Sequence, residues 1–320
     1  MYKKVDILEN KICEISQSIL ETLIKDRSSK KNIIWATDAY ASRGYGYQEN
    51  DEIALTAITG RNGLVIKPRI EKSKKTQQIR VRDKAEVFTP SWMCNSQNNL
   101  IDNAWFEKEN VFNFEKEKTW VTNFDKIEFP NKKVWQDYVK ANRLEITCGE
   151  APYLASRYDT VSGERIDIKN RIGILDRKVR VINENIKTEE DWHKWALAAF
   201  KATFGFEWQG DSLLIARENM LYTYIEYYID RFAKQPSKEQ LVSIAEVISW
   251  NIWQMDGLKF VIPNSCKSAP QLQRSLFEED SEECYGCKND DKCAHTGIYC
   301  KIMDWETGKA FKFVDLLKGR

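Results

Sequence analysis

Apolar and polar side chains alternate along this chain with spacings that predict its elements. Residues 5–26 carry Ile and Leu three or four positions apart, as on one face of an amphipathic helix. The apolar segments NIIWATDAY (32–40) and DEIALTAITG (51–60) are typical of strands, and a loop with Gly and Tyr separates them. The pattern therefore predicts an amino-terminal region with one helix and two strands.

The alternation becomes more regular in the second half of the chain. The spacing predicts, in chain order, a strand with a turn (143–151), a helix with a short strand (192–208), a long helix (211–234) and a helix with a strand and turn (239–258). Strands that alternate with helices pair in parallel. We therefore expect an α/β protein built on a parallel sheet.

The composition is that of a folded globular protein. Hydrophobic residues make up 42% of the 320 residues and charged residues 30%, which argues against disorder. This length suits one large domain, or a core with one or two small appendages. The net charge is only +1, so a strongly basic coat is absent and any nucleic-acid contact must come from local patches.

Neither a membrane span nor a signal peptide is predicted. No run approaches the roughly 20 apolar residues that cross a bilayer, and charges interrupt the apolar positions near the amino terminus. Four of the eight Cys crowd into residues 284–300, which fits a reduced protein with one metal site better than a secreted disulfide scaffold. We therefore expect a soluble cytoplasmic protein without membrane contact.

The Cys-rich segment CYGCKNDDKCAHTGIYC (284–300) has the spacing of a zinc site. A C-x-x-C pair followed within a few residues by further soft ligands suits tetrahedral Zn²⁺. The predicted ligands are Cys284, Cys287, Cys293 and Cys300, with His295 able to replace Cys293. Such a four-ligand site is closed and therefore structural. The alternative is a set of free surface thiols, which would be prone to oxidation.

Three predicted strand ends carry residues suited to a nucleoside ligand. Ligands of doubly wound sheets bind at the carboxyl ends of the strands. In LEITCGEA, Gly149 allows close approach of the backbone and Glu145 supplies a carboxylate. In FGFEWQGD, Glu207 can accept ribose hydroxyls and Trp208 can cover an adenine ring, while Asp256 in NIWQMDGL can accept a hydrogen from an amine. Each acid can alternatively be a helix cap or a solvated loop residue.

These segments resemble the motifs of adenine-N6 DNA methyltransferases, including the modification subunits of restriction-modification systems. AEVFTPSW (85–92) resembles their G-x-F-x-T-P motif, and LEITCGEA resembles L-D-P-x-C-G-x-G. FGFEWQGDSLLIARENML and NIWQMDGL are similar to the two motifs that follow in the same order. The resemblance covers about residues 85–260.

The resemblance implies a Rossmann-like class I methyltransferase fold that binds S-adenosylmethionine. The residues that would surround the cofactor are Thr89, Pro90, Glu145, Cys148, Gly149, Glu207 and Asp256. The chain is then expected to consist of an amino-terminal α+β extension (1–84), a methyltransferase-like core (85–265) and a small zinc-binding carboxy-terminal segment (266–320).

The sequence departs from the family in two places. Ala151, followed by Pro152, stands where the family has its second glycine, which adds a methyl group near the expected ligand. The catalytic (N/D)-P-P-(Y/F) motif, which in the family binds the flipped target base, is missing. The nearest candidate for its carbonyl acceptor is Asn264, in IPNSC (262–266).

A basic run at 67–84 is the candidate contact to DNA. Its cations can follow a phosphate backbone. They are Lys67, Arg69, Lys72, Lys74, Lys75, Arg80 and Arg82. The alternative is a solvated basic loop or hairpin.

Three functional hypotheses follow. The first is an S-adenosylmethionine-dependent DNA methyltransferase of the adenine-N6 type, in a restriction-modification or defence system. The second is a catalytically inactive module that binds the cofactor and DNA and acts with a partner, such as a specificity or nuclease subunit. The third is an unrelated enzyme that uses another nucleotide on the same kind of sheet, which fold alone does not exclude.

Overall fold

A three-stranded parallel sheet lies at the centre of the protein. The computed structural model describes residues 9–84, 86–130, 134–266 and 283–319. The strands of the sheet are β3 (Arg143–Glu145), β4 (Thr203–Glu207) and β5 (Ile252–Gln254), in the order β3-β4-β5. The predicted α/β class with a parallel sheet is thus confirmed.

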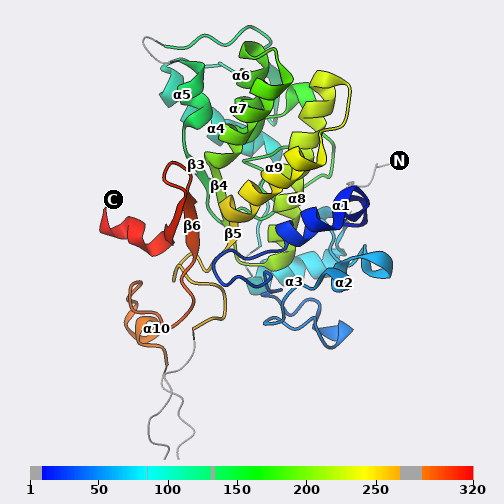
Figure 1. Ribbon diagram of the computed structural model, residues 1–320, viewed down its shortest axis with the longest axis vertical. Coiled ribbons are helices and arrows are strands. Elements are labelled where there is room, and N and C mark those ends of the chain that lie inside the picture. Colours follow the sequence, from blue (N-terminus) through cyan, green and yellow to red (C-terminus); the bar gives the residue numbers. More distant parts are fainter. Residues whose placement is uncertain (1–8, 85, 131–133, 267–282, 320) are drawn as a thin grey trace, which may run out of the picture.

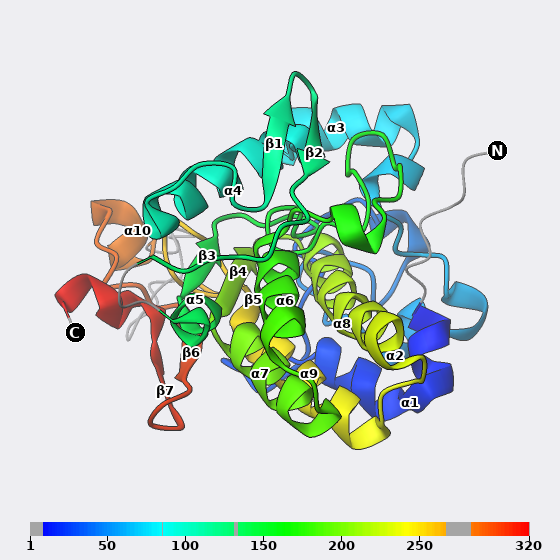
Figure 2. The ribbon, with the colours of Figure 1, turned by 90° about the horizontal axis from the view of Figure 1, so that it is seen from above.

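Two helical crossovers connect the strands. The first consists of α6 (Ile174–Asn185) and α7 (Glu189–Lys201), and the second of α8 (Gly210–Phe232) and α9 (Lys238–Asn251). Figure 2 shows these four helices grouped on one side of the sheet. Because both crossovers return the chain to the same end of the sheet, the carboxyl ends of the strands meet at one edge.

Helix α8 is the central helix of the core. Nearly every residue in its first three turns is buried, so its apolar surface is not confined to one stripe. Its Arg217 is fully buried and donates hydrogen bonds to the backbone oxygens of Ile252 (2.7 Å) and Lys25 (2.9 Å). Arg217 therefore joins β5 to the segment that follows α1.

The carboxy-terminal hairpin covers the other face of the sheet. It consists of β6 (Lys301–Asp304) and β7 (Lys309–Lys312), which pair antiparallel. Ile302 and the adjoining Phe313 pack with Phe206 and Trp253 in a second apolar cluster. The sheet is thus enclosed by helices on one face and by this hairpin on the other.

The amino-terminal region differs from the prediction. It contains α1 (Glu9–Leu23), α2 (Leu55–Ile58) and α3 (Lys74–Lys84), whereas the predicted strands at 32–40 and 51–60 form only isolated bridges. The reason is visible at Ile34. Its backbone N–H donates to Oε1 of Gln254 at 2.9 Å, and its backbone oxygen accepts from Nε2 of the same side chain at 2.8 Å. At this residue a side chain therefore takes the hydrogen bonds that a neighbouring strand would have made.

The remaining elements lie around this core. They are α4 (Ser91–Phe106), the hairpin β1 (Asn113–Lys116) and β2 (Thr119–Thr122), α5 (Trp135–Lys140), α10 (Tyr285–Asn289) and five short 3₁₀ segments (41–43, 60–62, 69–71, 168–170 and 313–318). Figure 1 shows α10 at the end of the molecule opposite α5. Within the described ranges, each helix is too short or too polar to cross a membrane.

Candidate cofactor pocket and metal centre

A cavity of about 900 Å³ opens at the carboxyl ends of β3 and β4. Five of the seven predicted cofactor residues line it, namely Thr89, Glu145, Cys148, Gly149 and Glu207. Pro90 lies just beyond the lining segment, as the residue that precedes the first turn of α4. Asp256 is not part of this cavity and lines a neighbouring one instead. Segments far apart in sequence thus converge where a parallel sheet binds its ligands.

The turn after β3 is built from left-handed residues. Thr147, Gly149 and Ala151 have φ angles of 48°, 53° and 62°. A Cβ at Gly149 would make only an ordinary contact with the ring of Phe88, at 3.4 Å, so it is the left-handed backbone that favours glycine here. Ala151 is fully buried in the main core and is not among the cavity-lining residues. The extra methyl group therefore does not occupy the cavity, contrary to the concern raised by the sequence.

Glu207 connects the ends of two strands. Its carboxylate accepts hydrogen bonds from the backbone N–H of Gly149 (2.9 Å) and of Gln209 (3.1 Å). Burial raises the pKa of Glu207, although these N–H groups act in the opposite direction. The carboxylate thus holds the glycine turn against β4 before any ligand is bound.

Two residues that line the same cavity also carry buried, unpaired acceptors. Oε2 of Glu145 and Oε1 of Gln209 are buried and find no hydrogen-bond partner among the described residues. The other oxygen of Glu145 accepts the N–H of Tyr153 at 3.4 Å. Burial raises the pKa of Glu145 well above its usual value, and the nearby charge of Glu207 adds to the effect. Because buried polar atoms are nearly always paired, these two oxygens lack the donors that such burial normally requires.

Two cations of the basic run form buried ion pairs within the protein. Lys72 Nζ lies 2.9 Å from Asp211 Oδ2, and Arg80 Nη2 lies 3.0 Å from Asp211 Oδ1. Burial by itself would raise the pKa of Asp211, but the charges of Arg80 and Lys72 hold it below its usual value. The prediction of DNA contact is therefore corrected for Lys72 and Arg80, whose buried charges stabilise the start of α8.

The other members of the basic run remain near the surface. Lys67, Lys74, Lys75 and Arg82 are exposed, and Arg82 also lines the cofactor cavity. The guanidinium of Arg69 lies over the ring of Phe88, 5.1 Å from its centroid. The run is mostly helical, as α3, and not a loop or hairpin.

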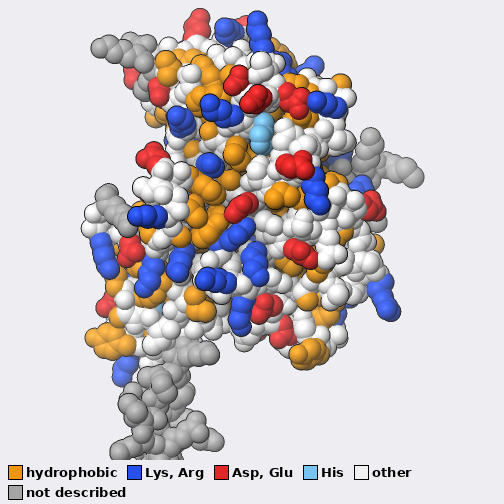
Figure 3. All heavy atoms as spheres, viewed as in Figure 1, with side chains coloured by type: hydrophobic (Ala, Val, Ile, Leu, Met, Phe, Trp, Pro, Cys, Tyr) orange, Lys and Arg blue, Asp and Glu red, His pale blue; other side chains and the backbone are white. Residues whose placement is uncertain are grey.

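Figure 3 shows a further band of Lys and Arg across one face, between the β6–β7 hairpin and the segment after α1.

The Cys-rich segment contributes to a four-residue group that can hold a metal ion. The ligand atoms of Cys266, Cys284, Cys287 and His295 all lie within 4.8 Å of one another. The three sulfurs are 3.7–3.8 Å from Nδ1 of His295. Tetrahedral Zn²⁺ with ordinary bond lengths places sulfur and nitrogen ligands about 3.6 Å apart. The arrangement is therefore compatible with zinc.

The ligand set differs from the predicted one. Cys284, Cys287 and the alternative ligand His295 belong to the group, but Cys293 is exposed and lies outside it. Cys300 is buried in the second apolar cluster, and its sulfur lies 3.2 Å from the backbone oxygen of Gln254. Cys266, which the sequence pattern missed, takes the remaining place.

A smaller cavity of about 280 Å³ adjoins the metal group. It is lined by Asp256, Lys259, Asn264 and Trp208, together with Cys266, Cys284 and Cys287. Oδ1 of Asp256 accepts the N–H groups of Leu258 (2.9 Å) and Lys259 (3.2 Å), as in a capped turn. Trp208 also lines the larger cavity, so this residue is common to the two spaces.

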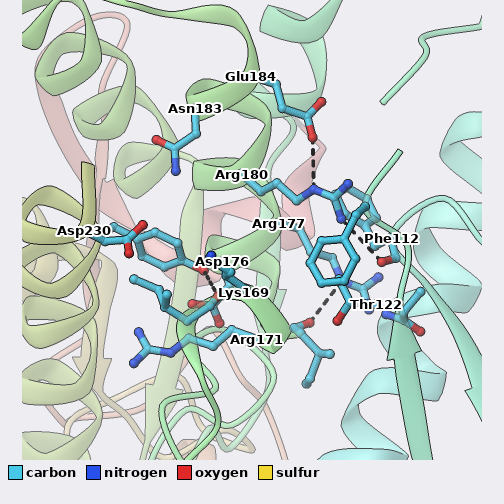
Figure 4. Close-up of a pocket in the computed structure, with 15 residues that line it drawn as sticks. Phe112, Thr122, Lys169, Arg171, Asp176, Arg177, Arg180, Asn183, Glu184 and Asp230 are labelled. Carbon is cyan, nitrogen blue, oxygen red and sulfur yellow. Dashed lines mark hydrogen bonds and ion pairs between the residues drawn. The ribbon is translucent and has the colours of Figure 1, made fainter. Parts of the chain in front are cut away.

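A third cavity, of about 470 Å³, lies between the β1–β2 hairpin and α6 and is drawn in Figure 4. Arg177 is paired with Asp102 (2.5 Å), and Arg180 with Glu184 (3.0 Å). Both guanidinium groups also lie over the ring of Phe112, at 5.1 and 5.8 Å. These charges stabilise the packing of α6. No pattern in the sequence had marked this space.

Comparison with family models, curated proteins and solved structures found no match for this chain. The functional argument therefore depends on the two adjoining cavities, the metal group and the sequence motifs.

Proposed function

We propose that this protein binds S-adenosylmethionine in the 900 Å³ cavity and functions as a DNA methyltransferase-like protein of the adenine-N6 type. One observation carries the proposal. Thr89, Glu145, Cys148, Gly149 and Glu207 come from three separate motifs and line the same cavity. A coincidental resemblance of short motifs would not require them to meet.

The chemistry of the cavity fits this cofactor. S-adenosylmethionine carries a sulfonium and an ammonium group, and three carboxyl groups line the cavity, those of Glu86, Glu145 and Glu207. Its ammonium and ribose hydroxyls can donate hydrogen bonds to carboxyl groups among the lining residues. When bound, it supplies an electrophilic methyl group, and the side chains of this chain bind and orient it.

The strand order supports a Rossmann-like class I methyltransferase architecture. In such sheets adjacent parallel strands are joined by helices, and the ligand lies outside their carboxyl ends. The β3-β4-β5 order, with helices in both crossovers, has this arrangement over three strands.

DNA is the proposed partner. The exposed cations Lys67, Lys74, Lys75 and Arg82 form a local basic patch, and Arg82 extends it to the rim of the cofactor cavity. Such a patch follows phosphates without reading the sequence of bases. A specificity or nuclease subunit is then the proposed source of sequence recognition.

The second candidate function is a cofactor- and DNA-binding module without catalysis. It is favoured by the position of Asn264, which lines the smaller cavity and not the one that holds the predicted cofactor residues. No two prolines are adjacent in the sequence, so this chain contains no Pro-Pro motif to take its place. In this proposal a partner subunit supplies the catalytic residues.

We further propose that the metal is zinc in a structural role. Four protein ligands fill a tetrahedral shell and leave no position for a substrate. The metal then organises a short segment that has few apolar side chains of its own.

Calorimetric titration of S-adenosylmethionine, and of its demethylated product, tests the proposed pocket. We expect micromolar binding, weakened in Glu145→Gln and unchanged in the exposed control Glu306→Gln. A folded protein that binds neither compound would contradict the proposal. Transfer of radiolabelled methyl to DNA then separates the two candidates, since only the first predicts it.

A further inference from the structure

The metal group and the cofactor cavity share a wall. Trp208 lines both the 900 Å³ cavity and the 280 Å³ cavity, and three members of the metal group line the smaller one. Trp208 is held in place by two hydrogen bonds. Its indole Nε1 donates to the backbone oxygen of Ala36 at 3.2 Å, and its own backbone oxygen accepts from the side chain of Gln254 at 2.8 Å. The opposite wall of the smaller cavity is formed by the chain from Asp256 to Cys266.

That wall is a loop held at two ends. One end is β5, and the next residues form a tight turn in which Asp256 N donates to Val261 O at 2.8 Å and Phe260 N donates to Asp256 O at 2.7 Å. The other end is Cys266, a member of the metal group. Asn264 lies between the two ends and has a left-handed φ of 58°.

Hydrogen bonds and apolar packing hold the second part of the loop besides the metal ligands. Ile262 N donates to Ile298 O at 2.8 Å, and Ser265 Oγ accepts from Ile298 N at 3.0 Å. Cys266, by contrast, faces three ligands from the segment 284–295. A bound metal would join these two segments through four strong bonds. Without it, the loop keeps its hydrogen bonds and the apolar packing of Ile262 beside Cys300, but Cys266 loses its link to the three ligands of the Cys-rich segment.

The small cavity has the chemistry of an adenine compartment. Asp256 and Asn264 supply oxygen acceptors for an exocyclic amine, Lys259 supplies a donor for a ring nitrogen, and Trp208 supplies a flat apolar face. We propose that the metal at Cys266, Cys284, Cys287 and His295 controls cofactor affinity by fixing the loop from Asp256 to Cys266 as the outer wall of this compartment. The inference rests on the proposed function, because it assumes that the base of the bound nucleoside extends past Trp208.

The test compares zinc-loaded protein with protein stripped by a chelator. S-Adenosylhomocysteine and adenosine are titrated calorimetrically into both forms. We expect the stripped protein to bind both compounds at least tenfold more weakly, and added zinc to restore the affinity. Methionine alone, which would not enter the adenine compartment, should show no such dependence.

Two variants provide the matched comparison. Cys266→Ser removes one ligand and should reproduce the loss in protein loaded with zinc, whereas Cys293→Ser changes an exposed Cys outside the group and should have no effect. If Cys266→Ser does not fold, the restoration of affinity in stripped wild-type protein still decides the question.

The outcomes separate the inference from the proposed function. Equal affinity in both forms, with a folded stripped protein by circular dichroism, overturns metal control and leaves the cofactor pocket standing. Absence of binding by the zinc-loaded protein overturns the cofactor pocket, and metal control with it.

Discussion

Glu207 accepts a hydrogen bond from the backbone N–H of Gly149 at 2.9 Å, and this contact ties the end of β4 to the turn after β3. The residue that the motifs assign to the cofactor is thus also part of the frame of the pocket. Its replacement should affect binding and stability together, which separates it from residues that contact only the ligand.

We expect Glu207→Ala to abolish cofactor binding and to lower the free energy of unfolding. The substitution leaves the buried N–H groups of Gly149 and Gln209 without acceptors, at about 1–3 kcal/mol for each. Glu207→Gln retains one oxygen and should lose less stability. Calorimetric titration and urea unfolding measure the two effects. Unchanged affinity in a folded Glu207→Ala protein would remove this residue from the proposed site.

Cofactor affinity should rise with pH. Burial raises the pKa of Glu145, so the empty pocket holds this carboxyl group in its protonated form at higher pH than a free glutamate would. A cationic ligand favours the ionised form and displaces the proton, so binding strengthens as pH increases, by up to about tenfold per pH unit. Titration of S-adenosylmethionine across a pH series measures the slope. Glu145→Gln should flatten it, and a slope that persists unchanged would assign the proton to another group.

Zinc content should follow the ligand set in the structure. We expect about one equivalent of zinc per chain, retained in Cys293→Ser and lost in Cys284→Ser or His295→Ala. Metal analysis of protein purified without added zinc measures it. Loss of zinc in Cys293→Ser, or a Cys266→Ser protein with its full zinc content, would favour the ligand set predicted from the sequence.

Substitutions of Arg80 and Lys75 should have different effects, the first on stability and the second on DNA binding. Arg80→Ala leaves the buried carboxylate of Asp211 with Lys72 as its one close cation, beside the hydroxyl of Tyr40, and we expect a loss of about 3–5 kcal/mol in unfolding free energy. Lys75 is exposed, so Lys75→Ala should change stability by less than about 0.5 kcal/mol. In a DNA-binding assay over a range of salt, Lys75→Ala should reduce the affinity and the salt dependence. Equal effects of both variants on stability would contradict this division.

Stability should fall between about pH 4.5 and about pH 8 because of Glu9. This side chain is buried, and burial raises its pKa from 4.5 to about 8. In that interval the folded chain retains a proton that the unfolded chain releases, so rising pH favours unfolding by up to about 1.4 kcal/mol per pH unit. Below the interval the contribution is fully present. Urea unfolding of wild type and Glu9→Gln across the interval measures the difference, and parallel curves would contradict the prediction.

The sequence predicts best those elements whose conformation follows from the pattern of neighbouring residues. The segment 211–234 has a long apolar helical pattern, and α8 occupies nearly all of it. The strand ends at Glu145 and Glu207 follow short β patterns and converge at one cavity, as the parallel arrangement requires.

The failures concern partners that are distant in sequence. The segment containing Ile34 is apolar enough for a strand, but its backbone is satisfied by Gln254, which lies 220 residues away. Arg80 resembles a solvated cation until its contact with Asp211, 131 residues away, is known. Cys266 was missed because zinc motifs are recognised by dense spacing, whereas its loop reaches the metal group only through the fold.

The strand order described above has a consequence for folding kinetics. Leu144 pairs with Phe204, and Phe206 with Trp253, so each ladder can form only after a complete two-helix crossover lies between its partners. Helices form from local contacts, whereas non-local parallel pairing is slow. We therefore expect helical structure to accumulate early in refolding. The ability to bind the cofactor should be regained last, because its pocket exists only once β3 and β4 lie side by side.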